Sequence, residues 1–110
     1  MRKLRGDDID MKVNDIADEV YKLQKSRMGE LGGELTPELV FMHLTEEVGE
    51  IARQMVNRNT TMREYDPANM AEEISQAFLD LLVMSKTVGM DMELEAEKKL
   101  KDIKKKAGRV

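Results

Sequence analysis

The sequence of 110 residues contains no cysteine and no tryptophan, and only two prolines, two tyrosines and two phenylalanines. The absence of cysteine excludes a disulfide scaffold, a thiolate metal site, an iron–sulfur cluster and a cysteine nucleophile. No apolar run approaches the roughly 20 residues that a helix needs to cross a bilayer. The first ten residues lack the apolar centre of a signal peptide. We therefore expect one cytoplasmic domain over residues 1–110 that has no membrane partner.

With so few aromatic residues, the core must be filled by Leu, Ile, Val, Ala and the ten methionines, a mixture that favours helices over strands. Apolar residues recur at helical spacing between three breaks in the pattern. Thr36 and Asp66 each precede a proline and can cap a helix, Gly89 can end one in the left-handed conformation, and Asp91 can cap the last. The sequence predicts an all-α fold with helices at about 10–28, 37–59, 67–88 and 92–106.

The predicted first and last helices are amphipathic, as the two central ones are. A hairpin of the central helices would therefore leave apolar surface uncovered, and we expect a helical bundle that is completed by oligomerisation. The sequence thus predicts a homodimer or a higher homo-oligomer.

Charge is distributed unevenly along the chain. Residues 98–110 contain seven Lys or Arg and one acid, whereas residues 1–97 contain eleven basic and twenty-one acidic residues. An acidic body repels the phosphate backbone of nucleic acid, so we expect no binding of duplex nucleic acid. The same charge favours binding of cations.

Acidic residues border the predicted apolar stripes of the two central helices. At about 100° per residue, Glu47 and Glu50 lie within about 60° of each other on one helix, as do Glu73 and Asp80 on the next. If the stripes face each other, these four carboxylates converge, and each raises the pKa of its neighbours unless a cation such as Mg²⁺ or Mn²⁺ is bound. Alternatively, they are ordinary solvated acids. The stripes consist of Leu44, Val48, Ile51 and Met55 on one helix and Met70, Ile74, Ala77, Leu81 and Val88 on the other.

Two segments on successive predicted helices carry a resemblance to a known family. The strings HLTEEVGEIARQ and EEISQAFLDLLVMSKTVGMDMELEAEKKL resemble the MazG-like all-α nucleotide pyrophosphohydrolases, whose signature is E-E-x-x-E followed by E-x-x-D. The resemblance implies Mg²⁺-dependent hydrolysis of a nucleoside triphosphate to a monophosphate and pyrophosphate. A phosphoribosyl-ATP pyrophosphohydrolase, from the same superfamily, is the alternative enzyme.

The signature can be placed on this chain residue by residue. Glu46, Glu47 and Glu50 match its first half, and Glu73 opens the second, whereas Gln76 stands where the family has aspartate. An amide oxygen is neutral, so we expect Gln76 to weaken metal binding, and we infer that Asp80, one turn later, compensates. The expected metal ligands are Glu47, Glu50, Glu73, Gln76 and Asp80. Glu46 lies outside their cluster, either as the catalytic residue that orients water or as a solvated acid.

The last predicted helix carries the other residues that the resemblance implicates. Lys99 matches a basic residue that family members place near substrate phosphates, although a basic helix end is usually just solvated. Ile103 stands where many members have asparagine, which leaves recognition of the base or sugar open. We expect His43 at the surface or supporting the site. Gln76 and Ile103 also keep open a non-catalytic binding or regulatory protein with a degenerate site.

Overall fold

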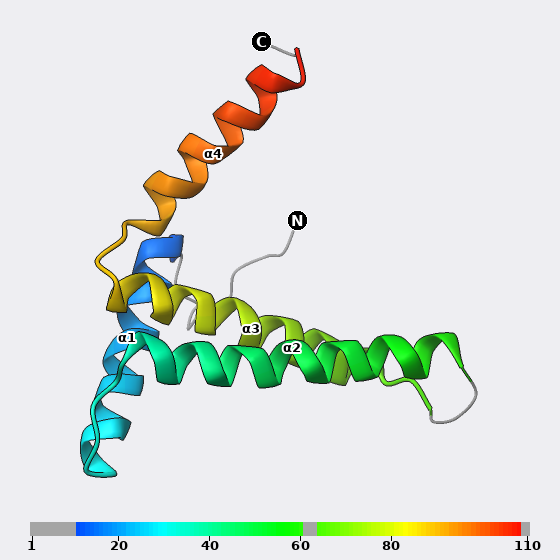
Figure 1. Ribbon diagram of the computed structural model, residues 1–110, viewed down its shortest axis with the longest axis horizontal. Coiled ribbons are helices and arrows are strands. Elements are labelled where there is room, and N and C mark those ends of the chain that lie inside the picture. The colour runs from blue at the N-terminus through cyan, green and yellow to red at the C-terminus, as the bar shows by residue number, and fades with distance from the viewer. Residues whose placement is uncertain (1–10, 61–63, 109–110) are drawn as a thin grey trace, which may run out of the picture.

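The computed structural model describes residues 11–60 and 64–108 as four α-helices, with no strand in those ranges (Figure 1). The helices are α1 (Val13–Glu30), α2 (Pro37–Asn59), α3 (Pro67–Thr87) and α4 (Met92–Lys106). The predicted all-α fold of four helices is confirmed, and so are the bounds of α2 and α4. None of the described helices is long and apolar enough to cross a membrane.

Side chains cap three of the helix starts as predicted. The Thr36 hydroxyl accepts a hydrogen bond from the Leu39 N–H at 3.2 Å before α2. The Asp66 carboxylate accepts from two N–H groups in the first turn of α3, and Asp91 accepts from the Leu94 N–H at 3.0 Å in α4. These oxygens satisfy backbone donors that a helix leaves without partners.

Glycines in the left-handed conformation follow three of the described helices, α1, α3 and, at Gly108, α4. Gly89, with φ 75°, follows α3 and lets the Met90 N–H donate to the Ser85 carbonyl at 2.8 Å. Before α2 the left-handed residue is Gly32, with φ 79°. Since Gly29 stays helical, α1 runs to Glu30, two residues past its predicted end. α1 begins at Val13, after two described residues that are not helical, so the predicted start near residue 10 was too early.

The helices form an open arrangement rather than a closed bundle. α2 and α3 pack as an antiparallel hairpin, α1 crosses it near the end of α3, and α4 contacts α1 and extends away from the hairpin (Figure 1). The radius of gyration, 17.1 Å, exceeds the about 13 Å of a compact domain of this length. The most buried large side chains, Leu82 and Val83, lie on α3.

One apolar face of the hairpin is uncovered. Convergence of the four carboxylates was expected only on the condition that the apolar stripes of α2 and α3 face each other, and this condition is met for only part of each stripe. Because α1 covers the hairpin on one side only, five stripe residues keep between 42% and 54% of their surface exposed: Val48, Met55, Ile74, Leu81 and Val88. The residues between the helices are partly polar instead.

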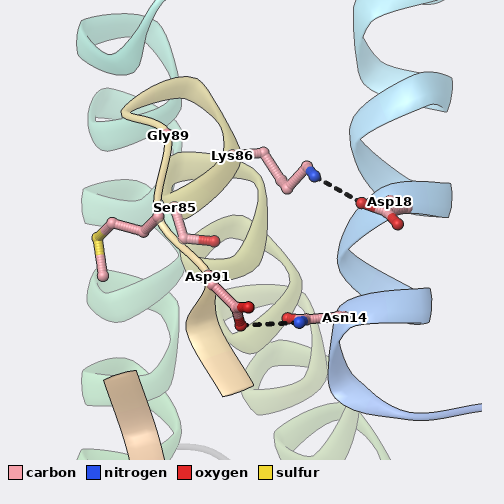
Figure 2. A pocket seen from close by; sticks show the side chains of 7 residues that line it. Asn14, Asp18, Ser85, Lys86, Gly89 and Asp91 are labelled. Atoms are coloured by element: carbon pink, nitrogen blue, oxygen red, sulfur yellow. Dashed lines mark hydrogen bonds and ion pairs between the residues drawn. The ribbon is translucent and has the colours of Figure 1, made fainter. Parts of the chain in front are cut away.

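The junction of α1, α3 and α4 is held by polar pairs around a hollow of about 320 Å³ (Figure 2). The Asn14 side chain donates to Asp91 at 2.8 Å, and Lys86 lies 2.6 Å from Asp18. The Asn14 hydrogen bond lowers the pKa of Asp91, helped by the Leu94 N–H. The hydrogen bond to Asp18 raises the pKa of Lys86. Each of these charges therefore has a partner.

Candidate functional site

Two carboxyl groups meet across the interface between α2 and α3. Glu73 is hydrogen-bonded to Glu47, which raises the pKa of Glu73; desolvation and the charge of Glu47 act in the same direction. The Glu47 side chain is 17% exposed. Two carboxylates that face each other repel, and a cation bound between them would remove this repulsion.

Asp80 lies deeper in the same interface. It is only 5% exposed, although helical spacing had placed it beside the apolar stripe, at the edge of the core. One carboxylate oxygen accepts from the Gln76 side-chain amide at 3.0 Å, and the other lies 2.8 Å from His43 Nδ1. Both oxygens are thus engaged, and the NH₂ group of Gln76 points at Asp80.

His43 connects the buried aspartate to the pair of glutamates. Its second ring nitrogen, Nε2, lies 3.6 Å from Glu47 Oε1. A continuous chain of polar side chains therefore crosses the interface, in the order Gln76, Asp80, His43, Glu47 and Glu73. The supporting position expected for His43 agrees with this geometry.

The remaining predicted site residues lie outside this row of polar side chains. Glu50 is half-buried, and Glu46 is exposed. Lys99 belongs to α4, where its nearest acid is Asp102 at 3.7 Å, and α4 extends away from the hairpin (Figure 1). Within one chain, the structure does not bring Lys99 to the carboxylates.

The site provides part of the donor set that a divalent cation needs. Among the described residues, no group of three or more His, Asp or Glu side chains already stands in an arrangement that holds a metal ion. The facing pair of Glu47 and Glu73 nevertheless has the hard oxygen donors that Mg²⁺ prefers. Gln54, further along α2, is buried with an Oε1 that has no hydrogen-bond partner. The glutamate pair thus offers donors of the right kind, but the described residues do not gather enough of them in one place to form a metal centre.

A groove of about 470 Å³ opens beside the polar chain. It is lined from α1 by Gln24, Arg27 and Met28, from the segment around the start of α2 by Leu35, Leu39, Val40 and His43, and from α3 by Gln76, Asp80 and Val83. His43 thus faces the groove and also approaches Glu47. The groove and the glutamate pair are neighbouring parts of one region.

Sequence reasoning missed the groove residues of α1. Arg27 had no distinguishing signal in the sequence, because its role depends on how α1 crosses the hairpin. Gln54 could have been suspected, since it shares the helical face of Glu47 and Glu50.

Comparison of the chain with protein-family models, curated proteins and solved structures finds no match in any of the three. The site must therefore be interpreted from its own chemistry and from the motif.

Proposed function

We propose that the protein is a Mg²⁺-dependent nucleotide pyrophosphohydrolase that converts a nucleoside triphosphate to a monophosphate and pyrophosphate. The observation that carries the proposal is the meeting of Glu47 and Glu73, one from each half of the MazG-like signature, across the α2–α3 interface. The two halves lie on separate helices, so their side-chain contact is not a consequence of sequence proximity.

The expected roles of the residues follow from their positions. Mg²⁺ or Mn²⁺ would be held by Glu47, Glu50 and Glu73, where it neutralises phosphate oxygens and lowers the pKa of bound water. His43 and Gln76 orient the buried Asp80. Glu46, exposed beside Glu47, is positioned to orient water on the solvent side.

The side chains of Gln76 and Asp80 would have to rearrange before either could bind the metal ion. Asp80 must exchange its hydrogen bond from Gln76 or His43 for the cation, and Gln76 must turn its carbonyl oxygen toward the site. We keep the proposal that Asp80 supplies the carboxylate that Gln76 lacks. Binding the cation would then cost Asp80 one of its present hydrogen bonds.

The proposed active form is a homodimer or a larger homo-oligomer. The chain exposes 8916 Å² of surface, against about 6,200 Å² expected for a compact monomer of 12.6 kDa. The uncovered face of the hairpin, defined above by Val48, Met55, Ile74, Leu81 and Val88, contributes apolar surface to this excess. A second copy packed on this face would complete a bundle.

The deciding experiment is an assay of the pure protein against canonical and damaged nucleoside triphosphates and phosphoribosyl-ATP, with Mg²⁺ or Mn²⁺. Pyrophosphate and orthophosphate are measured separately. The proposal expects pyrophosphate release with at least one nucleoside triphosphate. Release from phosphoribosyl-ATP alone identifies the alternative enzyme, and orthophosphate as the primary product rejects cleavage between the α and β phosphates.

One observation favours a second candidate, a nucleotide-binding or regulatory protein without turnover. Both carboxylate oxygens of Asp80 already interact with protein side chains, Gln76 and His43. These contacts give Asp80 a structural role that does not require catalysis. Nucleotide binding without any product in the same assay would establish this candidate.

A further inference from the structure

The groove beside the polar chain contains two side chains with fixed charge, Asp80 and Arg27. Both carboxylate oxygens of Asp80 already have protein partners, because they interact with Gln76 and His43. The Arg27 guanidinium has no ion pair and no side-chain hydrogen bond within residues 11–60 and 64–108. The groove therefore presents one positive group that lacks an anionic partner.

The wider charge distribution shows why this arginine matters. Residues 1–97 contain ten more acids than bases. Such an excess of negative charge repels a polyanion such as a triphosphate, which therefore needs a positive group where it binds. Lys99, the residue implied by the resemblance, is on α4 and lies 3.7 Å from Asp102. Within the same chain, Arg27 is better placed.

The other groove residues suit the rest of a nucleotide. Leu35, Leu39 and Met28 provide an apolar wall, and Gln24 adds a polar group. Gln76 uses one N–H toward Asp80, which leaves its carbonyl oxygen and its second N–H for other partners. The volume of about 470 Å³ falls within the roughly 300–1,000 Å³ of small-molecule sites.

We propose that this groove is the nucleotide-binding pocket and that Arg27 binds a phosphate group of the nucleotide. This inference rests on the proposed function, because Glu47 and Glu73, the pair proposed to hold the cation, lie next to His43 at the edge of the groove. A guanidinium binds phosphate through two parallel N–H bonds, which a lysine ammonium does not reproduce. Arg27 is thus a substrate-binding residue that the signature does not contain.

The test measures binding rather than turnover. Isothermal titration calorimetry in Mg²⁺ is carried out with α,β-methylene analogues of the common nucleoside triphosphates, with inorganic tripolyphosphate and with the free nucleosides. The variants are Arg27→Gln, Arg27→Lys and Lys99→Gln, and the first and last remove the same charge. Since Arg27 is exposed, melting temperatures close to that of the wild type check that each variant is folded.

The inference expects Arg27→Gln to weaken binding of the methylene triphosphate and of tripolyphosphate about tenfold or more. Arg27→Lys should lose less, Lys99→Gln should stay within about twofold of the wild type, and nucleoside binding should not change. If the wild type binds the triphosphate and Arg27→Gln binds it equally well, the inference is wrong while the proposed function stands. If the wild type binds no analogue, both are wrong.

Discussion

The α1–α3–α4 junction and the α2–α3 interface satisfy their charged groups in different ways. At the junction, Lys86 pairs with Asp18 at 2.6 Å, and Asp91 accepts from Asn14 at 2.8 Å (Figure 2). At the interface, two glutamates face each other, and the basic group nearest to them is His43, 3.6 Å from Glu47. The charged groups of the junction have partners, whereas within the described ranges the glutamate pair has no Lys or Arg in an ion pair.

On the proposed function, this difference separates residues that stabilise the fold from residues that bind the cation. Paired groups gain little from a ligand, because a ligand would have to displace an existing partner. Facing carboxyl groups gain from a cation, since it removes their repulsion and the cost of their burial. We therefore expect substitutions near the junction to change stability and substitutions at the interface to change the response to metal.

The largest effect is expected for Leu82→Ala. Leu82 is 1% exposed on α3, and its truncation should lower the free energy of unfolding by about 2–5 kcal/mol, because it leaves a cavity. Leu81→Ala is the matched control, since Leu81 is 46% exposed on the uncovered face. Chemical denaturation at low protein concentration measures both. Equal losses for the two variants would show that the described burial is wrong.

The interface should respond to divalent metal. Millimolar Mg²⁺ or Mn²⁺ should raise the melting temperature, with a gain of about 2.7 kcal/mol when the ion is present at a hundred times its Kd. Glu50→Gln and Glu73→Gln should remove most of this gain, and the exposed Glu19→Gln should retain it. Differential scanning fluorimetry measures the shifts. An unchanged wild-type melting curve in both ions would argue against the cation site.

The uncovered face of the hairpin should mediate self-association. Sedimentation equilibrium should give a mass above 12.6 kDa at micromolar concentration. The double variant Ile74→Lys with Leu81→Lys should sediment with a smaller mass than the wild type, because charges on the uncovered face oppose its burial between two copies. A wild-type protein that sediments as a clean monomer contradicts the oligomer and weakens any site that depends on a second copy.

The two regions should also differ in the sign of their pH dependence. The pKa of Glu73 is raised above 4.5, so its protonated form is favoured in the fold, and the stability from Glu73 falls as pH rises from 4.5 through the raised pKa. The pKa of Asp91 is lowered below 3.8, so its contribution is present above 3.8 and is lost as pH falls through the lowered pKa. At pH 7, Glu73→Gln should therefore stabilise the metal-free protein and Asp91→Asn should destabilise it. Shifts of the same sign in thermal denaturation would refute the contrast.

Local features of the fold were predictable from the sequence because they depend on nearby residues. Thr36, Asp66 and Asp91 cap helices through backbone groups two or three residues away. Gly89 ends α3 in the expected left-handed conformation. The end of α1 was misplaced because three glycines lie close together and only the backbone shows that Gly32 is the left-handed one.

The candidate site was predictable only in part, because its geometry depends on packing between distant segments. Helical spacing placed Glu47 and Glu73 on facing sides of their helices, and the structure brings them together. It could not predict the burial of Asp80, since His43, which shields it, is 37 residues away. The groove at Arg27 depends on the position of α1 across the hairpin, and the separation of Lys99 depends on the direction of α4.

The central claim is that the acidic α2–α3 interface hydrolyses a nucleoside triphosphate with a bound cation. The most direct test compares pyrophosphate release by the wild type, Glu47→Gln and Gln76→Asp at limiting Mg²⁺. The account predicts the highest rate for Gln76→Asp, because a carboxylate holds Mg²⁺ better than an amide, and the lowest rate for Glu47→Gln. Pyrophosphate release that is equal in all three proteins, or absent from all three, would contradict it.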